Sequence, residues 1–207
     1  MTSNMMEHLE SSNILYEMQY GFRTNRSSDS QIISLAHQLE QNNDKNIQTD
    51  LIIMDFTKAF EKVPHKRLIS KLKCYGISGQ ITIWITSLFA NRTQTVLLEN
   101  TTSENIAVTS GVPQGTVLGP ILFLIYINDL PDYIKHSQIR LFADDNIILY
   151  RPIKTQADCI KLQEHLESAV KWEHDWLMAF HPDKCNILRV TIKKSSQHFT
   201  TTCMGTS

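Results

Sequence analysis

The sequence lacks two features that would assign it to a common class of binding protein. It has no basic excess, because 20 lysines and arginines stand against 21 aspartates and glutamates, for a formal net charge of −1. Proteins that bind nucleic acid usually carry an excess of basic residues, so only a local cluster of basic residues could support nucleic-acid binding here. The four cysteines, at positions 74, 159, 185 and 203, include no closely spaced pair of the kind that binds zinc.

Long apolar segments are also missing. The longest run, residues 121–127, reads ILFLIYI, which is far shorter than the ~20 residues that span a bilayer. Residues 1–12 are polar and contain no apolar core of a signal peptide. With 42% hydrophobic and 20% charged residues, the composition is that of a globular protein. We therefore expect an intracellular chain, in the nucleus, the cytoplasm or both, with no membrane partner.

The order of the predicted elements indicates the fold class. A first helix begins near Ser27 and ends in the polar run 41–45. Apolar patterns and turn residues then predict a strand over 51–56, a helix over 120–129, strands over 139–143 and 147–150, a helix over 156–177 and a strand over 186–192. This βαββαβ order is typical of a ferredoxin-like antiparallel sheet, an α+β fold. We expect its helices on one face, with two helices and a hairpin inserted between residues 65 and 110.

Three aspartates lie where this fold brings distant segments together. Asp55 ends the first strand, and Asp144 and Asp145 separate the strands over 139–143 and 147–150. In the ferredoxin-like sheet these strands are neighbours, so the three carboxylates should lie close together and repel one another. Two Mg²⁺ ions, with Mn²⁺ as a substitute, would relieve that repulsion and support nucleotidyl transfer. Taken alone, an Asp-Asp pair between strands is more often only a turn.

Five motifs resemble those of the reverse transcriptase domain of non-LTR retrotransposons, of the LINE and jockey type. In chain order they are YGFRTNRSS at 20–28, LIIMDFTKAFEKVPH at 51–65, SGVPQGTVLGPILFLIYINDLP at 110–131, FADD at 142–145 and FHPDKC at 180–185. Each motif alone is weakly specific, but their shared order is very specific. The resemblance implies the fingers and palm of such an enzyme, over about residues 16–190.

The resemblance implies metal and sugar-selecting roles for individual residues. It implies that Asp55, Asp144 and Asp145 are catalytic and bind Mg²⁺, with the Phe56 carbonyl as a further ligand. Phe60 corresponds to an aromatic residue that would clash with a ribose 2′-hydroxyl and so select deoxynucleotides. Judged without the resemblance, Phe60 is an ordinary core aromatic.

The remaining implied site residues would contact the nucleotide or the template. Gln114 and Gly115 resemble positions near the incoming nucleotide and the template base, where glycine lets the backbone approach a ligand. The alternative is an ordinary Pro/Gly loop before a helix. Lys184 would approach the phosphates and protonate the leaving pyrophosphate, whereas most lysines simply face solvent. Arg23 and Arg26 would contact triphosphate or template phosphates.

The resemblance also implies a division of the chain. We expect partial fingers over 1–50, palm over 51–64, a fingers insertion over 65–110, palm over 111–192, and a degenerate or disordered tail over 193–207 with no thumb. Segment 58–73 has six basic residues and one acid, Glu61. It fits either a helix along a nucleic-acid backbone or a solvated face. Asn146 and His181 depart from the family pattern beside the predicted site.

These observations predict an RNA-directed DNA polymerase that extends the 3′-hydroxyl of a DNA primer with dNTPs on an RNA template. The alternative is an inactive, truncated retroelement remnant or an RNA-binding scaffold. A signalling cyclase with a similar palm is a third option, against which the template-facing segment 110–115 argues. The sequence leaves the oligomeric state open.

Overall fold

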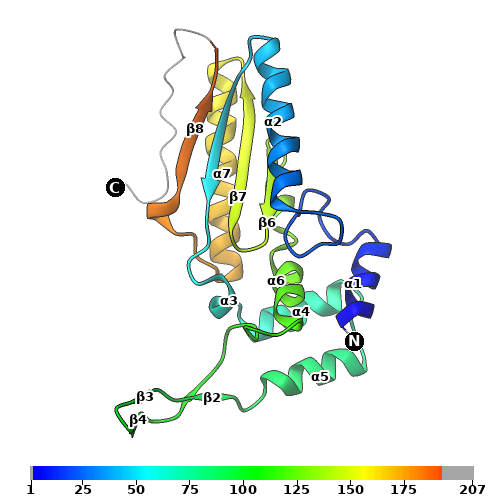
Figure 1. Cartoon of the computed structure of the whole chain (residues 1–207), viewed down its shortest axis with the longest axis vertical. Helices are drawn as coiled ribbons and strands as arrows, with labels where there is room; N and C mark the ends of the chain where they lie inside the picture. The colour runs from blue at the N-terminus through cyan, green and yellow to red at the C-terminus, as the bar shows by residue number, and fades with distance from the viewer. Residues whose placement is uncertain (1, 193–207) are drawn as a thin grey trace. The chain divides into compact units, whose positions relative to one another are not determined.

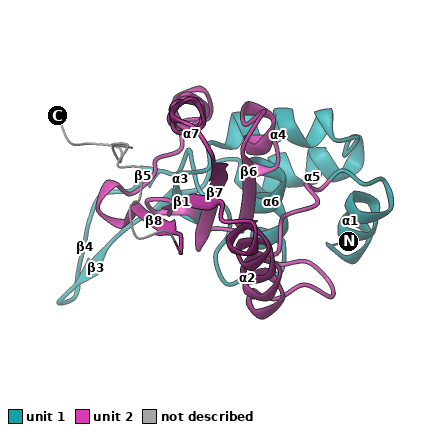
Figure 2. Cartoon of the chain, turned by 90° about the horizontal axis from the view of Figure 1, so that it is seen from above, with its two compact units in different colours: residues 1–14, 60–126 teal, residues 15–59, 127–207 magenta. Residues whose placement is uncertain are grey.

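The computed structural model describes residues 2–192 and divides the chain into two compact units. Unit 1 consists of Met1–Ile14 and Phe60–Tyr126, and unit 2 of Leu15–Ala59 and Ile127–Ser207 (Figure 2). The predicted tail over 193–207 lies outside the described residues. Each unit is therefore built from two separate stretches of the sequence.

A four-stranded antiparallel sheet forms the centre of unit 2. Its strands, in the order β6-β7-β1-β8, are β6 (Gln138–Phe142), β7 (Asn146–Ile153), β1 (Gln48–Met54) and β8 (Asn186–Val190). All three neighbouring pairs are antiparallel. This is the strand order of a ferredoxin-like sheet, so the predicted fold class is confirmed. Strand β1 is buried along nearly its whole length, as the apolar run 51–54 predicted, but it begins at Gln48 and ends at Met54 rather than spanning 51–56.

Two long helices of unit 2 cover opposite faces of this sheet (Figures 1 and 2). Helix α7 (Gln156–Trp176) lies on one face, and α2 (Ser28–Asp44) lies on the other. On α2, Leu35 and Leu39 pack against a buried cluster of Leu51, Ile148 and Tyr150. The sequence predicted both helices, but it gave no sign that α2 covers a second face. Short 3-10 helices, η1 (Leu130–Tyr133) and η2 (Pro182–Lys184), complete the unit.

Unit 1 is mainly helical. Its helices are α1 (Thr2–Ser11), α3 (Ala59–Lys62), α4 (His65–Cys74), α5 (Gln80–Phe89) and α6 (Leu118–Ile127), of which α3 and α6 each run one residue into unit 2. Helix α6 is apolar all round, and every residue from Ile121 to Ile127 is buried. Helix α1 had not been predicted from the sequence. No helix in the described part of the chain is long and apolar enough to cross a membrane.

The predicted hairpin between residues 93 and 109 is confirmed, as two short antiparallel pairs. Strand β2 (Thr93–Gln94) pairs with β5 (Ile106–Ala107), and β3 (Leu97–Leu98) pairs with β4 (Thr101–Thr102). The tip turns through Glu99 and Asn100, both in the left-handed region. All four strands are exposed, so the hairpin has no buried face of its own.

Candidate active site

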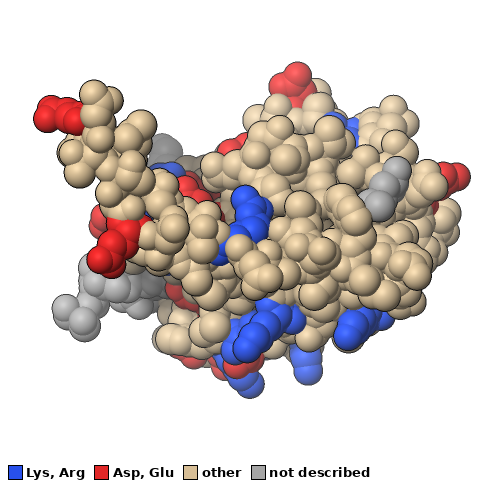
Figure 3. Space-filling view, turned by 90° about the horizontal axis from the view of Figure 1, so that it is seen from below, with Lys and Arg blue, Asp and Glu red and all other residues tan. Residues whose placement is uncertain are grey.

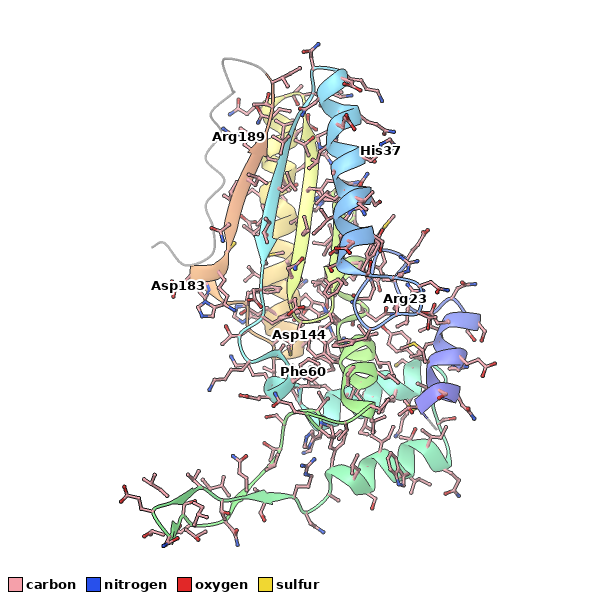
Figure 4. All side chains as sticks on the ribbon, viewed as in Figure 1. Arg23, His37, Phe60, Asp144, Asp183 and Arg189 are labelled. Carbon is pink, nitrogen blue, oxygen red and sulfur yellow. The ribbon has the colours of Figure 1, made fainter. Side chains whose placement is uncertain are left out.

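The strand pairing of unit 2 brings the three predicted catalytic aspartates to one end of the sheet. Pairing of β1 with β7 reaches Met54 opposite Ile147, and Asp55 follows directly. Pairing of β6 with β7 ends at Phe142 opposite Asn146, and Asp144 and Asp145 lie in the turn between them. Figure 4 shows Asp144 at this end of the sheet, whereas Arg189 lies toward the other.

The electrostatics of Asp144 reflect this crowding. Burial raises the pKa of the Asp144 carboxyl above its usual range, and the charges of Asp145 and Asp55 raise it further. A backbone hydrogen bond at Asp144 acts in the opposite direction but does not reverse the shift. The three carboxylates therefore share one electrostatic environment, in which a cation would be stabilised.

The backbone around Asp55 is fixed by the segment Ala179–His181. The His181 N–H donates to the Asp55 carbonyl at 2.8 Å, and the Thr57 N–H donates to the Ala179 carbonyl at 2.6 Å. The buried Phe56 ring stacks on Phe180, with 5.0 Å between ring centroids. The sequence assigned only Lys184 of this region to the site. These backbone contacts went unpredicted because they join residues more than 120 positions apart.

Lys184 itself lies at the predicted site. Its Nζ is 2.5 Å from Oδ2 of Asp55, and the two form an ion pair. The lysine side chain remains largely exposed, so it can leave the aspartate without opening the core. Its predicted contact with phosphates remains a prediction.

The donor chemistry of the aspartates suits a hard divalent cation. Among residues 2–192, no group of three or more His, Cys, Asp or Glu side chains is close enough to hold a metal ion as it stands. The Asp55 carboxylate is paired with Lys184. Carboxylate oxygens are the ligands that Mg²⁺ prefers, and the negative charges of Asp145 and Asp55, after burial, contribute to the raised pKa of Asp144. We conclude that these residues fit Mg²⁺ by their chemistry.

Three predicted site residues belong to unit 1. Phe60 is half-buried, and its ring stacks on the buried Phe123 of α6 with centroids 4.9 Å apart. Gln114 and Gly115 lie in an exposed turn before α6, and Gly115 has a φ of +71°, which favours glycine. A polar cavity of about 380 Å³ is lined by eleven residues: Glu61, Arg92, Gln94 and Ala107 to Gln114. The site residues that the resemblance implied are thus divided between the two units.

Arg23 and Arg26 hold the loop that precedes α2. Arg23 donates to the carbonyl of Tyr16 at 3.0 Å, and Arg26 donates to the carbonyl of Glu17. The Arg26 guanidinium also lies over the ring of Tyr20, 5.2 Å from its centroid. Both side chains are half-buried and have a role in folding this loop. Their predicted contact with phosphates remains a prediction.

The basic segment 58–73 is only partly a charged surface. Lys71 is buried, donates to the carbonyl of Tyr126 and lies 4.7 Å from the centroid of that residue's ring. Lys66 and Lys73 of the same helix are exposed. On the face shown in Figure 3, lysines and arginines form separate groups with uncharged surface between them. Lys71 therefore adds no charge to the surface of this helix, whereas Lys66 and Lys73 do.

Comparison with known sequences gives a consistent result. The sequence model of the family described as "Reverse transcriptase (RNA-dependent DNA polymerase)" matches residues 1–201. The "Probable RNA-directed DNA polymerase from transposon BS" of Drosophila melanogaster is 29% identical over 184 residues, which cover 83% of this chain and 20% of that protein. The "RNA-directed DNA polymerase from mobile element jockey" of the same species is 26% identical and covers 82% and 19%. The chain spans about a fifth of the length of these relatives.

Solved structures share the fold. Telomerase from Candida tropicalis, in complex with a fragment of telomeric RNA, aligns with a TM-score of 0.67 and 13% identity, covering 96% of this chain and 34% of that one. The apo form of that telomerase, truncated from its C-terminal domain, aligns with a TM-score of 0.62 and 12% identity, covering 99% and 41%. At such low identity these likenesses concern the architecture alone.

Proposed function

Because the chain belongs to the reverse transcriptase (RNA-dependent DNA polymerase) family, we propose that it catalyses RNA-directed DNA synthesis. It would add dNTPs to the 3′-hydroxyl of a DNA primer on an RNA template. The observation that carries the proposal is the meeting of Asp55 with Asp144 and Asp145 at one end of the unit 2 sheet. In this proposal residues 51–64 and 111–192 act as palm, and residues 1–50 and 65–110 as fingers.

The three aspartates would hold two Mg²⁺ ions, with the Phe56 carbonyl as a further ligand. Bound Mg²⁺ supplies activation of the primer hydroxyl and neutralises charge on the leaving pyrophosphate. Asp144 is half-buried, which would strengthen the interaction of its carboxylate with a cation relative to a fully solvated one. Lys184, which pairs with Asp55 and is largely exposed, would give a proton to the pyrophosphate once it releases that aspartate.

Residues of unit 1 would select the nucleotide. The Phe60 ring, fixed by its stacking on Phe123, would exclude the 2′-hydroxyl of a ribonucleotide. Gln114 and Gly115 would contact the incoming nucleotide and the template base from their exposed turn. Arg23 and Arg26 would add phosphate contacts from the loop before α2.

An RNA-binding scaffold without catalysis is the second candidate. It is favoured by the ion pair between Lys184 and Asp55, which neutralises one of the three carboxylates. A scaffold would bind primer–template duplex but would not need the aspartates.

The two candidates differ in a primer-extension assay. With oligo(dT) annealed to poly(rA), dTTP and Mg²⁺, a polymerase extends the primer, and the extension disappears when EDTA removes the metal. A scaffold retains the duplex in a filter-binding assay and extends nothing. Binding without extension would overturn the proposed activity and leave the family assignment intact.

A further inference from the structure

The loop before α2 runs along the edge strand β6 of the unit 2 sheet. The Tyr20 N–H donates to the Leu141 carbonyl at 2.8 Å, and the Leu141 N–H donates to the Met18 carbonyl at 3.0 Å. Gln19 and Leu141 thus form a parallel bridge. This short extra strand ends beside the turn that carries Asp144 and Asp145, which lies immediately after β6.

The side chain of Gln19 reaches into that turn. Gln19 is only 3% exposed, and its Oε1 accepts hydrogen bonds from the backbone N–H groups of Ala143 and Gly21, both at 2.9 Å. Ala143 has a φ of +46°, a left-handed conformation that is costly for a residue with a side chain. Such a conformation persists only where surrounding contacts stabilise it. The hydrogen bond with Gln19 directly stabilises the backbone of Ala143, the residue that precedes Asp144.

Gly21 presses the loop backbone against the same residue. A Cβ at Gly21 would lie 2.6 Å from both the Cβ and the backbone nitrogen of Ala143. Contacts below 3.0 Å are essentially never seen for real Cβ atoms, so any other residue would displace the turn or the loop. Gln19 and Gly21 therefore both contact the backbone of Ala143, Gln19 by a hydrogen bond and Gly21 by close packing.

We propose that Gln19 and Gly21 are positioning residues that set the Ala143 backbone and thereby the orientation of the Asp144 and Asp145 carboxylates. The proposal rests on the proposed polymerase function and deepens it, because it assigns a role to a loop outside the metal ligands. Displacing reacting groups by about 1 Å can cost on the order of 100-fold in rate. Both residues are buried, so we expect their effect on catalysis to pass through the turn.

The loop has anchors that do not depend on Gln19. The buried Arg140 donates to the hydroxyls of Tyr20 and Ser34, at 3.3 Å and 3.0 Å, and to that of Tyr150 at 3.0 Å. Together with the backbone bonds to Leu141, these contacts keep the loop on β6 when Gln19 is replaced. A Gln19 variant should therefore fold, with the turn as its altered part.

The test compares Gln19→Met with Gln31→Met in the full chain. Both glutamines are 3% exposed and belong to unit 2, but Gln31 lies on α2 and its buried Nε2 has no hydrogen-bond partner among the described residues. Methionine keeps the length of the side chain and removes the amide. In primer extension we expect Gln19→Met to lower kcat by about 10- to 100-fold, with KM for dTTP within about twofold, whereas Gln31→Met changes neither. Equal kcat in the two variants, or a loss confined to KM, would overturn the proposal.

Amide hydrogen exchange provides a second measurement that does not need catalysis. In the native chain the Ala143 N–H is protected by its hydrogen bond to Gln19. In the Gln19→Met variant this N–H should exchange at least about tenfold faster, while exchange of the amides in β1 and β7 stays unchanged. Gly21→Ala should have the same local effect through its clash. If the native chain extends no primer, the proposed function fails, and exchange still decides whether Gln19 holds the turn. Unchanged exchange at Ala143 in both variants would refute that hold.

Discussion

Lys184 and Asp55 form an ion pair across 129 positions of the sequence, with 2.5 Å between Nζ and Oδ2. The lysine side chain is 57% exposed and the aspartate 21% exposed. Exposed pairs of this kind typically contribute about 0–1 kcal/mol to folding. Stability is therefore a weak reason for this contact, and its place beside two further aspartates favours a role in the site.

Replacing Lys184 should separate stability from activity. We expect Lys184→Ala to change the free energy of unfolding by less than about 1 kcal/mol, because the pair is exposed, and to slow primer extension. Lys161→Ala, on the exposed side of α7, is the matched control and should change neither. Urea unfolding and single-turnover extension measure the two effects. Unaltered extension by Lys184→Ala would remove this lysine from the site.

A second ion pair, at the other end of the sheet, should matter for stability alone. Asp50 is 1% exposed, and Arg189 donates to its two oxygens at 3.1 Å and 3.2 Å, joining β1 to β8. Arg189→Ala removes the cation from the buried Asp50 carboxylate, to which the Gln48 amide still donates at 2.8 Å. Loss of one partner of a buried ion pair typically costs about 3–5 kcal/mol. The double variant with Asp50→Asn should recover part of this loss in urea unfolding. If Arg189→Ala were as stable as the native chain, the ion pair with Asp50 would not contribute to stability, and the prediction would be wrong.

The start of α7 should make unfolding depend on acid pH. Burial acts to raise the pKa of Asp158, but hydrogen bonds from Arg151 and from the Lys154 and Thr155 backbone outweigh it and lower the pKa to about 2. Because the pKa of Asp158 is lower in the folded state than in the unfolded state, its ionised carboxylate stabilises the folded protein at pH values above its ordinary pKa of about 4. That contribution is lost as the pH falls from about 4 to about 2. Because the site is close to solvent, we expect about 1 kcal/mol.

The measurement for Asp158 is a comparison of urea midpoints at several pH values. Asp158→Asn should be less stable than the native chain at pH 7, and the difference should shrink between pH 4 and pH 2. A constant difference over that interval would show that the charge of Asp158 does not produce it.

Phe60 should control the choice of sugar. Phe60→Val removes the ring that stacks on Phe123, so it should raise the use of UTP relative to dTTP. Steric discrimination by one pocket group is typically about 10–200-fold, and we expect a change of at least about tenfold in the ratio of kcat/KM values. The dTTP rate of the same variant is the internal control. An unchanged ratio would leave Phe60 as a core aromatic.

Local patterns were sufficient for the order of the sheet strands and of α7, and for the aspartates, although they did not predict α1. Residues 51–54 of β1 form an apolar run that Asp55 follows, and Asp144 and Asp145 lie between two short apolar strands. Strand order then follows from the βαββαβ sequence, because that connectivity has few compact solutions. The convergence of the carboxylates could therefore be predicted before any coordinates.

The contacts that hold these aspartates could not be predicted in the same way. Gln19 meets Ala143 across 124 positions, and His181 meets Asp55 through backbone atoms. Backbone hydrogen bonds between distant segments leave no periodicity or composition signal, since any residue can donate its N–H. Gln19 lies one residue before the motif that begins at Tyr20, and no sequence pattern assigned it a role.

The central claim, that Asp144 serves a polymerase site, is tested by primer extension on poly(rA)/oligo(dT) with Mg²⁺. The native chain is compared with Asp144→Asn and with Asp44→Asn, an exposed aspartate at the far end of α2. We expect extension by the native chain and by Asp44→Asn, and a loss of at least about 100-fold in Asp144→Asn, the scale of electrostatic contributions at active sites. Equal extension by all three proteins would contradict the assignment of the catalytic aspartates.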